Sequence, residues 1–364
     1  MRKGHAMIDV SVPLVCLALV GMGLMALYSV SLAMGKNWAE RQVLSLLIAM
    51  VAAGAIFWCS LSSLRRWVRV LMFTVLLLLA AVFLFEPRHG AHRWLYIGMS
   101  LQPVELCKWA VLLLTAHFSS RPQFNRCAIK FIKPVALWLL PALVLIYFQR
   151  DFGSLMLIIT VVLAILFMAG FNFRVLLILS LLAVVLAAVM IWAESYRMQR
   201  LLIFVNPFAD LLGNGYNQSH AIIAFLRGGL FGVGLGRSIE RWGYLPEMHN
   251  DFIIAIITEE MGLVGFLAVC ALLSFLVFRA ISIGQTAERR GEVFGALYAY
   301  GFAVLIGAQA VINMSGSLAL TPSKGFTLPL VSYGGSSLLS MGLLVGVLLR
   351  IDWENRQEQT AGGI

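Results

Sequence analysis

Charged side chains are scarce in this sequence of 364 residues. Asp, Glu, Lys and Arg make up 12% of the chain, whereas 61% of the residues are hydrophobic and the mean hydropathy is +0.91. A composition this apolar excludes an ordinary water-soluble globular protein, because there is too little polar surface to cover a core. Lipid must therefore be the solvent for most of the chain.

Patterns typical of metal sites and disulfide frameworks are also absent from the sequence. The six histidines are scattered, and only His89 and His92 lie close together. The five cysteines have no metal-ligand spacing, and most of them fall in apolar stretches. The sequence thus indicates neither a zinc site nor a disulfide scaffold. It contains no soluble domain and no internal repeat, so we expect a single membrane domain over residues 1–364.

The apolar stretches are long enough to cross a bilayer as helices, which requires about 20 residues each. We predict an all-α, polytopic integral membrane protein with ten spans. The expected spans are 13–34, 42–61, 68–85, 104–119, 134–148, 153–171, 174–193, 252–278, 294–314 and 331–350. The first span is too long for a signal-peptide core and has no small-residue cleavage site, so we keep it as a helix.

The distribution of lysine and arginine sets the expected orientation. With the N-terminus inside, fifteen of these residues fall in inner segments and six in short outer loops, in agreement with the positive-inside rule. We therefore expect cytoplasmic termini, a short cytoplasmic tail at 351–364 and a large outward-facing loop at 194–251. The formal charge of +10 is spread over the inner loops, where it can meet anionic lipid, so we do not expect nucleic acid as a partner.

Three outer segments are rich in glycine, proline and polar residues: 86–103, 194–251 and 315–337. If they converge, they roof a single cavity at the outer face. The longest of them combines acids that could move protons with cations that could hold phosphate, which indicates chemistry on a lipid-linked, anionic substrate. These residues are Glu194, Arg197, Arg200, Asp210, Arg227, Arg237, Glu240, Arg241, Glu247 and Asp251.

Glu105 and Lys108 lie three residues apart behind Pro103, which suits the first turn of a helix, so both charges share one face. Two interpretations remain open. The pair either neutralises itself and holds the helix bundle together, or it lines a cavity in which Lys108 is available to a phosphate.

Glu247 and Asp251 lie four residues apart, with Pro246 at an expected helix start and His249 between the two acids. A carboxylate at the mouth of a span could serve as a general base, whereas the alternative is a pair of solvated acids that cap a helix. Glu259 and Glu260, deeper in the same span, favour the functional interpretation.

Two glycine-rich stretches complete the candidate site. Residues 227–237 do not form a dinucleotide fingerprint, since no βαβ pattern surrounds them, and they indicate close backbone approach, tight turns or a flexible lid. Residues 324–337 either offer hydroxyl groups to a sugar or shape a re-entrant turn before the last helix.

At these segments the chain resembles the SEDS family (shape, elongation, division and sporulation) of bacterial membrane proteins, and more closely the division type than the elongation type. The resemblance is carried in order by 93–94, 102–108, 151–154, 197–210, 213–218, 246–252, 259–262 and 322–337. It implies a peptidoglycan glycosyltransferase that polymerises lipid II at the outer face of the bacterial inner membrane during cell division. The implied partners are lipid II, a class B penicillin-binding protein transpeptidase and other divisome membrane proteins.

The resemblance places the essential acid on Asp251, which we expect to be the catalytic base of an inverting displacement. Positive charge would stabilise the departing pyrophosphate, and a divalent cation, Mg²⁺ or Mn²⁺, could bridge it. The expected substrate-binding residues are Glu105, Lys108, Arg197, Arg200, Glu247, His249, Lys324, Ser332, Tyr333 and Ser336. Competing hypotheses are a lipid II flippase, an elongation-type polymerase and a non-catalytic scaffold.

Overall fold

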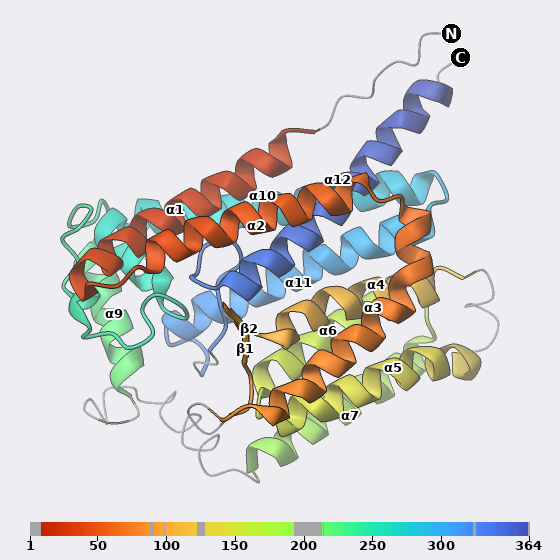
Figure 1. Cartoon of the computed structure of the whole chain (residues 1–364), viewed down its shortest axis with the longest axis horizontal. Helices are drawn as coiled ribbons and strands as arrows, with labels where there is room; N and C mark the ends of the chain where they lie inside the picture. The colour runs from red at the N-terminus through yellow and green to blue at the C-terminus, as the bar shows by residue number, and fades with distance from the viewer. Residues whose placement is uncertain are drawn as a thin grey trace.

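The computed structural model describes residues 9–87, 91–97, 99–121, 128–192, 213, 215–322 and 325–362. The described chain is a bundle of long helices that run roughly along one direction (Figure 1). Seven helical stretches are long and apolar enough to cross a membrane, so the protein is a multi-pass membrane protein, as expected. They are α1 (Ser11–Met34), α2 (Trp38–Trp58), α3 (Leu61–Ala81) with the short 3₁₀ turn η1 (Val82–Leu84), α7 (Phe173–Trp192), α10 (Ile253–Arg289), α11 (Val293–Ser317) and α12 (Gly335–Gly362).

Three shorter helices occupy the other expected spans: α4 (Pro103–Ser119), α5 (Ala128–Phe148) and α6 (Phe152–Met168). Helix α4 is buried along almost its whole length and lies between α3, α6, α11 and α12. A helix enclosed by protein does not have to match the full thickness of the bilayer, which explains how a 17-residue helix fits here. Each of the ten predicted spans thus coincides with a helix, although the ends differ by several residues.

Two elements were not predicted. Helix α9 (Tyr216–Gly228) lies within the polar interval 194–251, and a short antiparallel hairpin, β1 (Leu95–Ile97) with β2 (Met99–Leu101), precedes α4. Helix α9 packs on α10 and buries only a narrow stripe, including Ala221 and Ala224. Because the helix is short and several of its residues are polar, its sequence does not give the apolar signal of a membrane span.

Helix α10 is broken at Gly262, whose φ and ψ are 70° and −168°. The glycine-rich stretch after α9 inserts into the break, where Val233 N–H donates to the Glu259 carbonyl at 2.9 Å and Leu263 N–H donates to the Gly229 carbonyl at 2.9 Å. A Cβ on Gly232 would lie 2.1 Å from the Glu260 carbonyl oxygen. Of the three interpretations of this stretch, close backbone approach is therefore confirmed.

At the end of the bundle opposite to the connection between α1 and α2, the beginning of α1 lies close to α12 and α10 (Figure 1). Arg279 forms ion pairs with Asp9 and Asp352, and Arg356 pairs with the same two acids, at 3.3 Å from Asp9 and 2.7 Å from Asp352. This four-residue cluster fastens the start of α1 to α10 and α12.

Candidate functional site

Asp251 lies in a tight turn over residues 246–252, directly before α10. The backbone N–H groups of Asn250 and Asp251 donate to the Glu247 carbonyl at 3.0 and 3.1 Å. Glu247 has a left-handed backbone with φ 53°, which cannot continue into a right-handed helix. The expected helix start at Pro246 is therefore wrong, since α10 begins at Ile253. The turn leaves the Glu247 side chain exposed at 53%, whereas Asp251 is half-buried.

The Asp251 carboxylate packs against Gly325. A Cβ on Gly325 would lie 3.3 Å from Asp251 Oδ2, and the φ of Gly325 is +62°. The Asp251 carbonyl accepts a hydrogen bond from Asn313 Nδ2 at 2.9 Å. A small pocket opens beside the acid, lined by Asp251, Phe252, Ile312, Asn313, Gly316, Ser317, Gly325 and Phe326. The acid is thus fixed at the edge of a pocket and partly removed from solvent.

The segment before α12 holds this turn in place. Ser332 Oγ donates to the Asn250 carbonyl at 2.6 Å and accepts from Leu328 N–H at 2.7 Å, while Tyr333 N–H donates to the His249 carbonyl at 3.0 Å. Ser332 and Tyr333, both predicted as substrate contacts, therefore clamp the backbone on the two residues that precede Asp251.

His249 stacks on Trp38, the first residue of α2, with ring centroids 4.1 Å apart and planes inclined by 6°. Burial lowers the pKa of the His249 imidazole below its usual value, while Glu247, whose carboxylate lies 3.9 Å away, acts in the opposite direction. Burial therefore favours the neutral form of the imidazole. Gln42, one turn further along α2, donates to the Ser332 carbonyl at 3.0 Å and accepts from Gly334 N–H at 3.2 Å.

Glu105 and Lys108 form an ion pair of 2.7 Å with side chains 6% and 1% exposed. Lys108 Nζ also donates to Gln309 Oε1 at 3.3 Å and lies 5.8 Å from the centre of the Phe326 ring. The predicted pairing on one helix face is confirmed. The ammonium group points at protein partners beneath the 326–327 segment, so in this arrangement it is not presented to a phosphate.

Gln309 and Asn313 connect the ion pair to the turn over residues 246–252, and sequence reasoning missed them both. They lie four residues apart on α11, hence on one face. Gln309 Nε2 donates to the Thr327 carbonyl at 2.9 Å, and Asn313 Nδ2 donates to the carbonyls of Phe326 and Asp251. Two amides in an otherwise apolar span were the available signal, because buried polar groups in a membrane are costly unless they have a role.

Ser336 joins the polar segment 315–337 to the segment that precedes α4. Its hydroxyl accepts from Gln102 N–H at 2.9 Å and donates to the Ser100 carbonyl at 3.2 Å. Nearby, Gln218 of α9 donates to the Thr321 carbonyl at 3.3 Å. Described parts of all three polar segments are therefore joined through residues of the third segment.

Glu259 and Glu260 form a separate buried cluster at the break in α10. Glu259 accepts from Arg227 at 2.6 Å, from Ile239 N–H at 2.9 Å and from the Ser238 hydroxyl. Glu260 accepts from the Ser29 hydroxyl of α1. The hydrogen-bonding partners of both acids come from α9, from residues 236–240 and from α1, so the two acids join these segments to α10.

Arg197, Arg200 and Lys324, the other predicted substrate contacts, lie outside the described residues. Within the described ranges, no group of three His, Cys, Asp or Glu side chains is arranged to hold a metal ion. Among the described residues, Asp251 is the acid that lines the small pocket. In proteins, Mg²⁺ is commonly held by one or two carboxylates together with substrate phosphates.

The sequence and the fold both have clear relatives. Residues 10–357 match the profile of the FtsW, RodA and SpoVE family, described as "Cell cycle protein". The "Probable peptidoglycan glycosyltransferase FtsW" of Aromatoleum aromaticum is 38% identical over 352 residues, covering 92% of this chain and 86% of the relative. Its counterpart in Halomonas elongata is 42% identical over 295 residues, covering 79% and 74%.

Solved structures agree with the sequence comparison. A chain of the structure "Structural coordination of polymerization and crosslinking by a peptidoglycan synthase complex" superposes with a TM-score of 0.80 at 26% identity, covering 96% of this chain and 98% of that one. The rod shape determining protein RodA of Thermus thermophilus gives a TM-score of 0.70 at 26% identity, covering 95% and 96%. The chain therefore belongs to the FtsW, RodA and SpoVE family of cell cycle proteins and is similar, within it, to the FtsW members.

Proposed function

We propose that this chain polymerises lipid II and that Asp251 is the general base of the reaction. The chain is a peptidoglycan glycosyltransferase of the cell-division type, in line with the names of its relatives. The observation that carries the assignment of Asp251 is its position: a half-buried carboxylate at the edge of a pocket, on a turn whose backbone is fixed by Ser332, Tyr333 and Asn313. Fixed geometry of this kind is what general-base catalysis requires.

The proposed step is one inverting displacement. The 4-hydroxyl oxygen of one N-acetylglucosamine forms a bond to the anomeric carbon of N-acetylmuramic acid on a second lipid II molecule. The bond between that carbon and the phosphate oxygen breaks, and undecaprenyl pyrophosphate leaves with the electron pair. Asp251 takes the hydroxyl proton. The α linkage becomes β, so no covalent enzyme intermediate is needed.

Positive charge must stabilise the departing pyrophosphate. We assign this role to Arg197, Arg200 and Lys324, whose side chains can form charge-assisted hydrogen bonds to phosphate. We assign Lys108 a different role from the one first predicted. Its side chain is 1% exposed, and its ammonium is bound to Glu105 and Gln309, so Lys108 supports the floor under residues 326–327 and thereby positions Gly325 and Asp251.

A divalent cation would supply further charge at the pyrophosphate, held mainly by the substrate phosphates and water. The proposed site faces the periplasm, and both termini face the cytoplasm of a bacterial inner membrane, as the excess of lysine and arginine in the inner segments supports.

The proposed partner is a class B penicillin-binding protein, since the similar solved chain comes from a complex that couples polymerisation to crosslinking. Other divisome membrane proteins would assemble around this pair.

The experiment is lipid II polymerisation by the purified chain together with its class B penicillin-binding protein, with Asp251→Asn beside wild type. Glu40→Gln is the matched control, because Glu40 is an exposed carboxylate in the first turn of α2, near the same end of the bundle. We expect glycan strands from wild type and Glu40→Gln, and none from Asp251→Asn. Full activity of Asp251→Asn would overturn the assignment of the base, and a folded wild-type complex without product would favour lipid II transport or scaffolding.

A further inference from the structure

A group of arginines lies at the end of the bundle that carries both chain termini, where α3 begins and α4 ends (Figure 1). Arg65 and Arg69 are four residues apart on α3, hence on one face, and Arg121 follows the end of α4, which packs against α3. Burial lowers the pKa of Arg121, and the positive charges of Arg69 and Arg65 lower it further. The three guanidinium groups therefore act on one another, and they form the α3–α4 arginine cluster.

Neutral groups hold two of these side chains in place. Arg121 Nη2 donates to His117 Nε2 at 3.2 Å, and the Arg121 guanidinium lies 4.8 Å from the centre of the Phe118 ring. The guanidinium of Arg65 lies 5.2 Å from the centre of the Phe294 ring. Contacts with an imidazole or an aromatic ring orient a guanidinium without cancelling its charge. The charge of the cluster therefore stays available to an anion.

The cluster has more positive than negative charge. Glu292 lies 3.4 Å from Arg65, and the two side chains are 43% and 36% exposed, so this pair is screened by solvent. Among the residues that the structure describes, no carboxylate forms an ion pair with Arg69 or Arg121. Three guanidinium charges less one carboxylate leave two positive charges. Helix α3 also begins here without an acid in its first turn, so the helix dipole adds to the positive potential.

Other arginines at the same end of the bundle are balanced by acids of the chain. Four arginines of α10, α12 and the residue after α10 each form an ion pair with a carboxylate. They are Arg279, Arg290, Arg350 and Arg356, and their acids are Asp9, Asp352, Glu354 and Glu358. The excess of positive charge is thus concentrated at α3 and α4 and is not a uniform property of this face.

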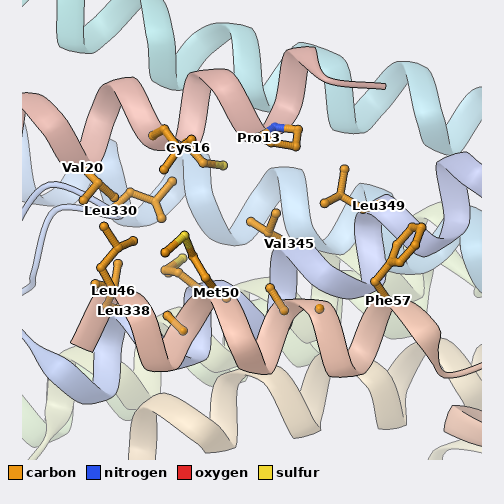
Figure 2. Close-up of a pocket in the computed structure, with 16 residues that line it drawn as sticks. Pro13, Cys16, Val20, Leu46, Met50, Phe57, Leu330, Leu338, Val345 and Leu349 are labelled. Carbon is orange, nitrogen blue, oxygen red and sulfur yellow. The ribbon is translucent and has the colours of Figure 1, made fainter. Parts of the chain in front are cut away.

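Exposed tryptophans place the cluster at the level of the lipid headgroups. Trp67, which lies between the two arginines of α3, is 62% exposed, and Trp58, the last residue of α2, is 78% exposed. Tryptophan is enriched where the hydrocarbon region of a membrane meets the headgroups. An apolar crevice between α1, α2 and α12 has Phe57, the residue before Trp58, at one end (Figure 2). The mainly apolar part of α3 begins at Val70, so the arginines precede the hydrocarbon region.

We propose that the α3–α4 arginine cluster binds the phosphate of an anionic phospholipid in the leaflet at this end of the bundle, which is the cytoplasmic leaflet in the proposed orientation. Guanidinium groups form parallel hydrogen bonds to phosphate oxygens, and a phosphate shared by α3 and α4 would join the two helices. The site lies at the other end of the bundle from Asp251 and does not depend on the proposed reaction. The alternative is that these arginines act only as diffuse topological charge, in which case any arginine of this face would be equivalent.

The binding experiment measures lipid retained by the purified full-length protein in native mass spectrometry, with phosphatidylglycerol as the anionic probe and phosphatidylethanolamine as the zwitterionic one. We expect a tightly retained phosphatidylglycerol and no comparable phosphatidylethanolamine. Arg69→Gln and Arg121→Gln should each raise the Kd for that phosphatidylglycerol by about fivefold, the effect of one arginine beside anionic lipid. Arg174→Gln is the matched control, because it removes an exposed arginine from the first turn of α7, also on the proposed cytoplasmic side. It should leave the Kd nearly unchanged.

Two results would overturn the proposal as diffuse charge: equal retention of the two lipids, or the same loss in Arg174→Gln as in the cluster variants. Displacement of the lipid by an excess of inorganic phosphate would refute the lipid assignment and give the site to a free phosphate. We expect no such displacement, because the acyl chains of the lipid contribute to its retention.

Thermal unfolding gives a second measurement that does not require equal stability of the variants. Added phosphatidylglycerol should raise the melting temperature of wild type and of Arg174→Gln more than that of Arg69→Gln or Arg121→Gln, each compared with the same variant without lipid. Arg69→Lys keeps the charge but loses the planar fork, so its response should lie between those of wild type and Arg69→Gln. The same response in all of these proteins would refute the site.

Discussion

The hydroxyl of Ser332 donates a hydrogen bond of 2.6 Å to the carbonyl of Asn250, the residue directly before Asp251. The two residues are 82 positions apart in the sequence. The same hydroxyl accepts from Leu328 N–H, so a single side chain joins the segment before α12 to the turn before α10. The position of the proposed base is therefore determined by a distant part of the chain.

Ser332→Ala should lower both stability and polymerisation. The substitution leaves the Asn250 carbonyl and the Leu328 N–H without their side-chain partner, and an unsatisfied buried polar group costs about 1–3 kcal/mol. Thermal unfolding in detergent and the rate of glycan formation measure the two effects. Ser62→Ala, at an exposed serine of α3, is the control. A Ser332→Ala protein with the activity and melting temperature of wild type would show that the clamp is dispensable.

Gly325→Ala should impair polymerisation far more than stability. The left-handed backbone of Gly325 strains any other residue by about 1–2 kcal/mol, and the new Cβ would press on Asp251 Oδ2 at 3.3 Å. Gly35→Ala separates these effects, because Gly35 has nearly the same φ, +59°, and open space around its Cβ position. We expect similar losses of melting temperature from both variants and a large loss of turnover from Gly325→Ala alone. Equal turnover in the two variants would contradict the contact argument.

Lys108→Met should destabilise the protein strongly, because it leaves the buried Glu105 carboxylate unpaired, at a cost of about 3–5 kcal/mol. The double variant Glu105→Gln with Lys108→Met removes both charges and should unfold at a higher temperature than Lys108→Met alone. A thermal-unfolding double-mutant cycle measures this coupling. Additive losses in the cycle would mean that the two side chains act independently.

Acidification should weaken the contact between His249 and Trp38. The pKa of His249 in the folded protein is lowered from 6.5 by burial, so below pH 6.5 the unfolded chain binds a proton that the folded protein resists. The stability contribution is therefore fully present above about pH 6.5 and is lost as pH falls towards the lower folded pKa. His249→Phe keeps a ring on Trp38 and cannot titrate. The difference in melting temperature between wild type and His249→Phe should change between pH 7.5 and 5, and a constant difference would refute this account.

Much of the fold follows from the sequence because each span leaves a long apolar signal. The ten predicted spans correspond to helices, and the interval 194–251 stands out by its polarity. Helix α9 was missed because the few residues that it buries are small or polar, among them Gln218, Ser219 and Ala221. The break at Gly262 was missed because the hydropathy of α10 continues across it, and the bonds that fill the break come from residues 229–234 of a different segment.

The candidate site was partly predictable. Sequence motifs pointed to Asp251, Ser332 and Tyr333, which the structure brings together. They could not show that Ser332 and Tyr333 bind backbone carbonyls in the structure, since that depends on how two distant turns pack. Trp38 and Gln42 were also missed, because a tryptophan and a glutamine at the start of a span are commonly read as interface residues.

The most direct test of the central claim separates kcat from KM for lipid II in the Asp251→Asn variant, in complex with the class B penicillin-binding protein. A general base acts in the transition state, so the account predicts that kcat falls by about 10²–10⁴ while lipid II binding, measured directly, is unchanged. A kcat within a few-fold of wild type, or a loss explained by weaker lipid II binding alone, would contradict it.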